Sequence, residues 1–302
     1  MFVRFLFLVS LCLVGFYKGT SQENKHSVPK VTFGTIERWE DFGSQYVDSR
    51  NIDIWVSPYC MRNEGCRVLY MHDGQMLYDS STTWNKQEWR VDETFEILHK
   101  DGFGVDFIVV GIWNNGKYRP AEFFPQKALN EMDCNDKNIL LNRFPDKKPL
   151  ADQYLKFIVQ ELKPAIHHAF KTRTDMASQY IGGSSMGGLI SMYAILEYPG
   201  EFSTAICMST HWPGIFVSND CIPNAILSYL ESNHYKLSKD HKIYFDYGTA
   251  TLDSIYEPYQ LKADKILLGK VFKTTSVKYS GADHSENSWA KRLNEVFLWN
   301  LR

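Results

Sequence analysis

The chain has 302 residues, a formal net charge of −2 and 44% hydrophobic residues. That length suits one large α/β domain with an ample apolar core. The near-neutral balance of mixed charges argues against nucleic acid or another polyanion as a partner.

The first residues have the pattern of a secretory signal peptide. Arg4 precedes the apolar run Phe5–Phe16, and Gly19–Ser21 supplies small residues for cleavage. The apolar run is too short to cross a membrane as a helix. We therefore expect residues 1–21 to be removed. Residues 22–302 would then form a single exported domain, periplasmic or secreted, without a membrane span.

Of the six cysteines, Cys12 lies in the expected signal peptide and five remain after cleavage. An odd number leaves at least one free thiol in an exported protein. Cys60 and Cys66 flank the turn-like Met61–Gly65 between two predicted strands, which suits a hairpin disulfide. Cys207 lies in an apolar strand and is expected to be a buried thiol.

Strand patterns begin at Val31. From Val31 to Val56, apolar and polar residues alternate in two or three segments, which predicts antiparallel strands at a sheet edge. Further along, short apolar strands alternate with helices, which predicts an α/β fold with a mostly parallel central sheet and helices on both faces. The predicted strands are Arg67–Met71, Phe107–Gly111, Tyr180–Gly182, Thr204–Met208, Ile243–Asp246 and Thr274–Tyr279.

Three further segments complete the expected organisation. Asp152–Phe170 has apolar residues at helical spacing and is predicted to be a core-packing helix. Ser288–Leu301 is predicted to be the last helix. Gln126–Leu150 has no clear period and is rich in Asn, Asp, Lys and Pro. We expect residues 126–150 to form a surface insertion near the edge of the sheet that would hold an active site.

The most informative motif is Gly183-Ser184-Ser185-Met186-Gly187, a G-x-S-x-G sequence between an apolar strand and a helix. In this context the motif predicts a nucleophile elbow, a strained turn that exposes Ser185. Ser184 is the weaker candidate nucleophile. If Ser184 were the nucleophile, the second residue after it would be Met186, and a side chain at that position collides with the strand. The elbow also directs the Met186 amide toward an anion forming at Ser185.

A general base for Ser185 is expected at the carboxyl end of a later strand, where sites in parallel sheets form. His284 follows the last predicted strand in a glycine-containing loop, where this type of site places its base. His234 and His241 lie before a strand, at the other end of the sheet. His72 precedes Ser185 in the chain and is interpreted as bracing its own loop.

An acid that orients the imidazole should follow the strand Ile243–Asp246. We favour Asp253, because Gly248 permits a turn that places Asp253 in the loop facing the site. Asp246 still belongs to the alternating pattern of the strand itself, before the loop begins. Glu257 fits the start of a helix, where a carboxylate is favoured by the helix dipole alone. Both remain alternatives.

A second oxyanion donor is expected after the strand Arg67–Met71. There His72-Asp73-Gly74 turns the backbone so that the Gln75 amide can point inward. Metal chemistry is poorly supported, because the adjacent His167 and His168 point to different faces of a helix. The sequence has no phosphate-binding glycine loop and no CxxC pair, so we expect no metal or cofactor.

Together these motifs resemble the esterase family of α/β-hydrolases, which includes esterase D, feruloyl and acetylxylan esterases, enterobactin-type esterases and mycolyltransferases. The resemblance implies an α/β-hydrolase fold with Ser185 as nucleophile and His284 as general base and acid. It also implies an oxyanion hole from the Gln75 and Met186 amides. The likeness begins at about residue 43 and is clearest in Val68–Gln75, Trp84–Glu93, Arg119–Pro125, Glu161–Pro164 and Ile181–Gly188.

Aromatic residues near predicted strand ends suggest the substrate. The candidates are Trp84, Trp89, Trp113, His211 and Trp212, which could form walls for a planar acyl group or a sugar face. The first hypothesis is an exported serine esterase acting on acylated carbohydrate, such as feruloyl or acetyl esters. The second is a periplasmic esterase that opens the trilactone of a catecholate siderophore. An acyltransferase of the same fold and a non-catalytic binding domain are the others, and an intact Ser185 with a base argues against the last.

Overall fold

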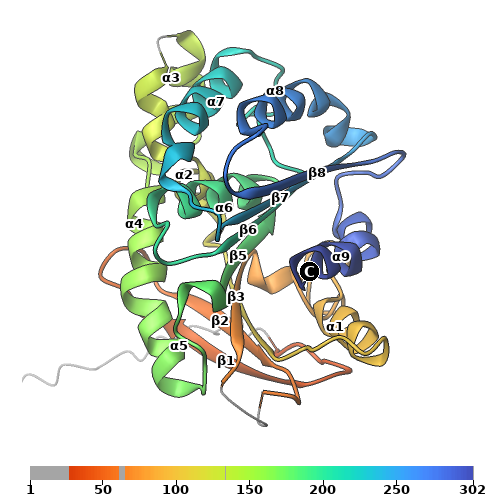
Figure 1. Cartoon of the computed structure of the whole chain (residues 1–302). Coiled ribbons are helices and arrows are strands. Elements are labelled where there is room, and N and C mark those ends of the chain that lie inside the picture. The colour runs from red at the N-terminus through yellow and green to blue at the C-terminus, as the bar shows by residue number, and fades with distance from the viewer. Residues whose placement is uncertain (1–26, 61–64, 133, 302) are drawn as a thin grey trace, which may run out of the picture.

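The computed structural model describes residues 27–60, 65–132 and 134–301; the expected signal peptide, residues 1–21, lies outside them. One sheet of eight strands has the order β1-β2-β4-β3-β5-β6-β7-β8. Helices cover both of its faces (Figure 1). This arrangement confirms the predicted α/β class.

Two N-terminal strands form the antiparallel part of the sheet, as predicted. β1 (Thr35–Phe42) is an edge strand and pairs with β2 (Arg50–Val56), which pairs in turn with β4 (Phe107–Ile112). From β4 onward every pairing is parallel. The remaining strands are β3 (Arg67–His72), β5 (Gln179–Ser184), β6 (Thr204–Met208), β7 (Lys242–Gly248) and β8 (Lys273–Tyr279).

The apolar core is divided by the sheet. α1 (Val91–Lys100) and the C-terminal α9 (Glu286–Leu301) pack together on one face, and the other main helices lie across the sheet from them (Figure 1). Within the described residues, no helix is long and apolar enough to cross a membrane. The other α-helices are α2 (Arg119–Phe123), α3 (Asn135–Leu141), α4 (Ala151–Lys156), α5 (Lys163–Ala169), α6 (Met186–Glu197), α7 (Cys221–Asn233) and α8 (Glu257–Leu267).

The predicted helix Asp152–Phe170 is present and contains one irregularity. A π-helical turn, Phe157–Leu162, joins α4 to α5. Pro164, the second residue after this turn, has no amide hydrogen to donate to the carbonyl four residues earlier, which accounts for the widened turn. The apolar face is buried as expected, with Leu155 and Ile166 fully inaccessible.

Residues 126–150 are more ordered than their sequence suggested. They contain α3 and two 3-10 turns, and Leu129, Leu140 and Phe144 belong to the buried core. Cys134 is disulfide-bonded to Cys221 at the start of α7. The expected surface insertion therefore has its own apolar packing, and its lack of a clear period reflects helical turns too short to show one.

The other cysteines agree with the sequence predictions. The predicted disulfide between Cys60 and Cys66 is present, with Cα atoms 5.3 Å apart. Cys207 is a buried free thiol in β6, and burial raises its pKa well above the ordinary value. A raised pKa keeps this thiol protonated, so its contribution is to packing.

Candidate active site

Ser185 occupies a strained turn between β5 and α6. Its backbone angles are φ 58° and ψ −122°, in a region that residues with a side chain rarely adopt. Gly183 and Gly187 make the turn possible, because a Cβ on Gly183 would lie 3.1 Å from the Gly187 Cα. The Ser185 amide donates to the Met208 carbonyl of β6 over 2.9 Å and fixes the turn. This is the geometry expected for a nucleophile elbow.

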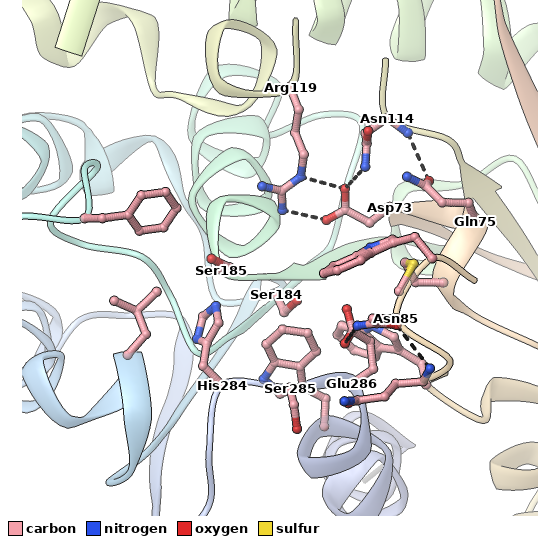
Figure 2. Close-up of a pocket in the computed structure, with 17 residues that line it drawn as sticks. Asp73, Gln75, Asn85, Asn114, Arg119, Ser184, Ser185, His284, Ser285 and Glu286 are labelled. Atoms are coloured by element: carbon pink, nitrogen blue, oxygen red, sulfur yellow. Dashed lines mark hydrogen bonds and ion pairs between the residues drawn. The ribbon is translucent and has the colours of Figure 1, made fainter. Parts of the chain in front are cut away.

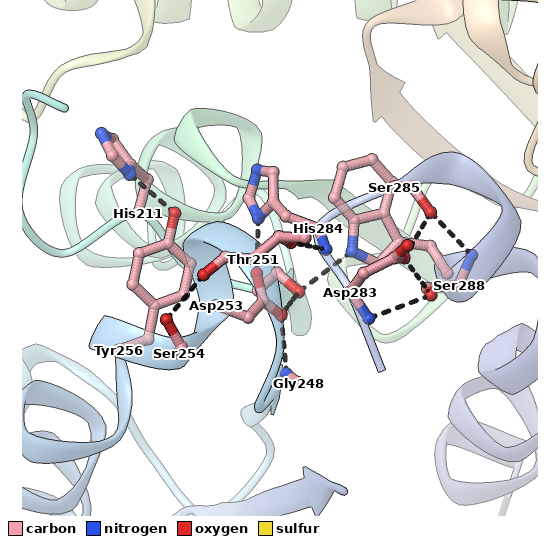
Figure 3. Close-up of polar contacts among 12 residues, drawn as sticks. His211, Gly248, Thr251, Asp253, Ser254, Tyr256, Asp283, His284, Ser285 and Ser288 are labelled. Carbon is pink, nitrogen blue, oxygen red and sulfur yellow. Dashed lines mark hydrogen bonds and ion pairs between the residues drawn. The ribbon is translucent and has the colours of Figure 1, made fainter. Parts of the chain in front are cut away.

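His284 lies in the loop after β8 and is held by Asp253. The His284 Nδ1 donates to Asp253 Oδ1 over 2.5 Å. The fully buried Asp253 also accepts hydrogen bonds from the Gly248 amide and the Ser209 hydroxyl (Figure 3). Burial would raise the pKa of Asp253, but hydrogen bonding and charge from His284, Ser209 and Gly248 hold it below its ordinary value. Asp253 is therefore a carboxylate at neutral pH.

The two alternative acids have other partners. Asp246, on β7, forms a buried ion pair with Arg292 of α9 over 2.7 Å. Burial raises the pKa of Asp246, although Arg292 opposes that shift. Glu257, at the start of α8, pairs with Lys278 over 2.7 Å. Among these carboxylates the structure brings only Asp253 into contact with the predicted base.

Ser185 and His284 line one cavity of about 510 Å³ at the carboxyl ends of the strands. The imidazole of His284 points toward Ser185 (Figure 2). The volume lies in the range typical of small-molecule sites. The structure thus brings the predicted nucleophile and base to the same cavity wall.

One of the two predicted oxyanion donors, Gln75, lines this cavity, and the other, Met186, lies next to Ser185. Met186 is the first residue of α6, directly after Ser185. Gln75 lines the cavity in a 3-10 turn that begins after Asp73, which has φ 57°. A Cβ on Gly74 would lie 2.3 Å from the Gly111 carbonyl carbon, so only glycine lets this turn lie against β4. That the Gln75 and Met186 amides bind an oxyanion stays a prediction.

Of the five aromatic residues predicted to form a wall, two line the cavity and three do not. Trp84 and Trp89 line it, and 83% of the Trp84 surface is exposed. Trp212 is fully buried, and its indole donates to Gln260. The indole of Trp113 donates to Asp53 away from the cavity. Tryptophans pack under loops as readily as they face ligands, so proximity to a strand end was not enough to separate the two.

Trp289 also lines the cavity, beside Trp89, and was not predicted from the sequence. It belongs to the last helix, for which no role in the site was predicted. The two indoles contact each other at 5.2 Å between ring centroids, and the Trp289 ring meets His284 edge to face at 5.1 Å. Trp289 therefore helps to fix the predicted base.

An ion pair that the sequence did not reveal also faces the cavity. Arg119 donates two hydrogen bonds of 2.7 Å to Asp73, and the Asn114 side chain donates a third over 2.8 Å (Figure 2). Burial would raise the pKa of Asp73, but Arg119 and Asn114 lower it below its ordinary value. Both ion-pair residues lie in stretches that carried the family resemblance, which was the available signal.

The remaining predicted aromatic residue, His211, is buried behind the site. Its Nδ1 shares a hydrogen bond of 2.7 Å with the Tyr256 hydroxyl (Figure 3). Burial lowers the pKa of His211 to about 3, and the charges of His284, Arg143 and Arg119 act in the same direction. Burial raises the pKa of Tyr256, and hydrogen bonding with the Ser185 side chain opposes that shift. A neutral imidazole and a phenol thus lie behind the predicted nucleophile.

Other histidines and possible metal ligands lie elsewhere. His72 is fully buried, and its Nδ1 shares a hydrogen bond with the Tyr154 hydroxyl, consistent with a bracing role. Within the part of the chain that is described, Cys134, Asp136 and Cys221 form the one group with metal-ligand spacing. The two sulfurs of this group are joined in a disulfide, so they are not free to bind an ion.

Comparisons with known proteins agree with this architecture. A family model described as "Putative esterase" matches residues 45–299. The uncharacterized protein YbbA of Bacillus subtilis (strain 168) is 26% identical over 155 residues, which span 51% of this chain and 54% of that protein. The match therefore extends over about half the length of this curated relative.

Two solved structures are similar over most of their length. A ferulic acid esterase has 16% sequence identity and a TM-score of 0.61, with 89% of this chain and 98% of that chain covered. The siderophore hydrolase EstB from Aspergillus nidulans has 16% identity and a TM-score of 0.63, with 89% and 96% covered. At these identities the similarity establishes the α/β-hydrolase fold.

Proposed function

This chain belongs to the esterase family whose model it matches, a family of carboxylic-ester hydrolases, and we propose that Ser185, His284 and Asp253 are its catalytic triad. The observation that carries the proposal is the meeting of two features on one cavity wall. One is the strained turn at Ser185, and the other is the His284 imidazole fixed by Asp253.

In the proposed mechanism, the Ser185 hydroxyl attacks the ester carbonyl while His284 Nε2 takes its proton. Asp253 holds the Nδ1 proton of His284 and stabilises the imidazolium. The Gln75 and Met186 amides bind the oxyanion of the tetrahedral intermediate. His284 then protonates the leaving alkoxide, which yields the alcohol and an acyl-enzyme. Water, with His284 again as base, releases the acid and restores Ser185.

The cavity favours an uncharged substrate. Among the described residues that line it, the one arginine, Arg119, is paired with Asp73, and Glu286 adds a further negative charge. A ferric catecholate carries several negative charges and would need unpaired cations. An acylated carbohydrate is neutral, and the exposed indole of Trp84 suits a sugar face. We therefore propose feruloyl or acetyl esters of carbohydrate as the substrate class.

Export is part of the same proposal. The disulfides Cys60–Cys66 and Cys134–Cys221 would be maintained in an oxidising compartment. The signal-like pattern of residues 1–21 supports the same location. We propose that the protein acts in the periplasm or outside the cell.

The test compares methyl ferulate, an acetylated xylo-oligosaccharide and a catecholate trilactone at equal concentration, with kcat/KM as the measurement. We expect one of the first two to be preferred. A preference of about a hundredfold for the trilactone would overturn the carbohydrate proposal, since a shaped pocket discriminates on that scale. Added sugar acceptor should not divert product from hydrolysis to transfer. If it does, the acyltransferase hypothesis replaces this one.

A further inference from the structure

The cavity has two chemically different sides. Phe216 and Leu252 follow β6 and β7, whereas Trp84 and Asn85 follow β3. In the sheet, β5 lies between β3 and β6, so these two groups of residues lie on opposite sides of Ser185 at the end of β5. One side is apolar, and the other combines an indole with polar side chains.

On the polar side, hydrogen bonds join two segments that lie far apart in the chain. The Asn85 side-chain amide donates to Glu286 at the start of α9 over 2.8 Å, and the Asn287 amide donates to the Gln87 side chain over 3.4 Å. The Asn85 side-chain oxygen accepts from the Gln87 amide over 3.1 Å. These bonds fasten the loop after β3 to the helix after His284. Figure 2 shows Asn85 and Glu286 side by side, with Ser285 between this pair and His284.

Trp84 is the unusual member of this side. Its indole is 83% exposed although it lines a cavity, and the neighbouring Asn85 is held by hydrogen bonds. Phe216, on the apolar side of the same cavity, is also exposed, at 69%, so each side offers an aromatic ring to a ligand. An exposed ring next to an amide and a carboxylate matches a ligand that has an apolar face bordered by hydroxyl groups, which describes a sugar ring.

We infer that Trp84, Asn85 and Glu286 form the subsite for the alcohol part of the ester, a sugar ring, and that Phe216 and Leu252 contact the acyl part. This inference rests on the proposed esterase function. The alcohol oxygen must receive its proton from His284, and Glu286 follows that residue by two positions and lies on the polar side. A sugar bound there would present its esterified oxygen toward the imidazole.

The experiment measures kcat/KM for two esters of one acid, methyl ferulate and feruloylated arabinoxylo-oligosaccharide. We expect the intact enzyme to prefer the oligosaccharide ester by about tenfold or more. Trp84→Ala should lower the ratio of the two values by about tenfold, and Glu286→Gln should lower it in the same direction. Phe216→Ala should lower both values together and leave their ratio in place.

Tyr235→Ala is the matched control, because Tyr235 is a similarly exposed aromatic residue, at 73%, that does not line the cavity. It should leave both kcat/KM values unchanged. An unchanged ratio in Trp84→Ala, with both esters still hydrolysed, would overturn the subsite while leaving the esterase function intact.

Binding of an unesterified xylo-oligosaccharide provides a measurement independent of turnover. In Ser185→Ala it should quench tryptophan fluorescence, and adding Trp84→Ala should abolish the change. If quenching depends on Trp84 but neither ester is hydrolysed by the intact enzyme, the subsite holds and the proposed ester specificity fails. If the oligosaccharide binds equally with and without Trp84, the subsite is wrong.

Discussion

Asp253 and His284 are joined by a hydrogen bond of 2.5 Å from His284 Nδ1 to Asp253 Oδ1, although they lie in loops after different strands. The bond fixes the proton on Nδ1. The remaining nitrogen, Nε2, is then an acceptor on the side of the ring that points toward Ser185 (Figure 2). The tautomer needed for general-base catalysis is therefore set by the fold before a substrate binds.

Asp253→Asn should lower kcat for a p-nitrophenyl ester by about two to four powers of ten, because the amide favours the wrong tautomer of His284. Asp246→Asn should act on stability instead, by about 3–5 kcal/mol, since it leaves Arg292 buried without its ion-pair partner. Kinetics and denaturant unfolding of both variants check this. Greater loss of activity in Asp246→Asn at unchanged stability would show that the acid has been misassigned.

Tyr256→Phe removes the hydroxyl between His211 and Ser185. We expect kcat to fall by about tenfold, the effect of one orienting hydrogen bond, and phosphonate labelling of Ser185 to slow by a similar factor. A structural role alone would lower the melting temperature without slowing the labelling. That second outcome would show that Tyr256 does not position Ser185.

The lowered pKa of His211 predicts how the stability of the fold depends on pH. Its folded-state pKa of about 3 lies below the ordinary value of 6.5, so between these pH values the unfolded chain binds the proton and acidification destabilises the fold. The unfolding free energy of the wild type, minus that of His211→Gln, should fall by about 1.4 kcal/mol per pH unit below pH 6.5. Parallel stability curves for the two proteins would contradict a neutral, buried His211.

The disulfide Cys134–Cys221 closes a loop with a sequence separation of 87, against 6 for Cys60–Cys66. In the chain-entropy model the longer loop stabilises by about 4.6 kcal/mol and the shorter by about 2 kcal/mol. Replacing both members of each pair by serine and measuring unfolding in denaturant tests this order. An equal loss from the two replacements would contradict the loop-length argument.

The sequence predicted the fold well because the signals were local. Most strands of the parallel sheet are short apolar runs, and the elbow at Ser185 is a five-residue pattern in which Gly183 lies close to the Gly187 backbone. The position of His284 followed from strand order. Such features depend on a few neighbouring residues or on topology, and both can be read without coordinates.

The missed features depend on side chains far apart in the chain. Arg119 pairs with Asp73 over 46 positions, and Trp289 packs at the cavity against Trp89, which lies in a distant segment of the chain. For the tryptophans, the deciding fact was the partner of each indole: Gln260 for Trp212 and Asp53 for Trp113. Those pairings are set by tertiary packing, which periodicity does not describe.

The central claim is that Ser185 is the nucleophile, and its most direct test is covalent labelling. A fluorophosphonate should modify Ser185 alone, as read by mass spectrometry of a digest. Ser185→Ala should abolish both labelling and ester hydrolysis with the fold intact, a loss of several powers of ten. Ser184→Ala, one residue away in β5, should keep most of both. Label on any other residue, or a Ser185→Ala variant that retains most of its activity, would contradict the claim.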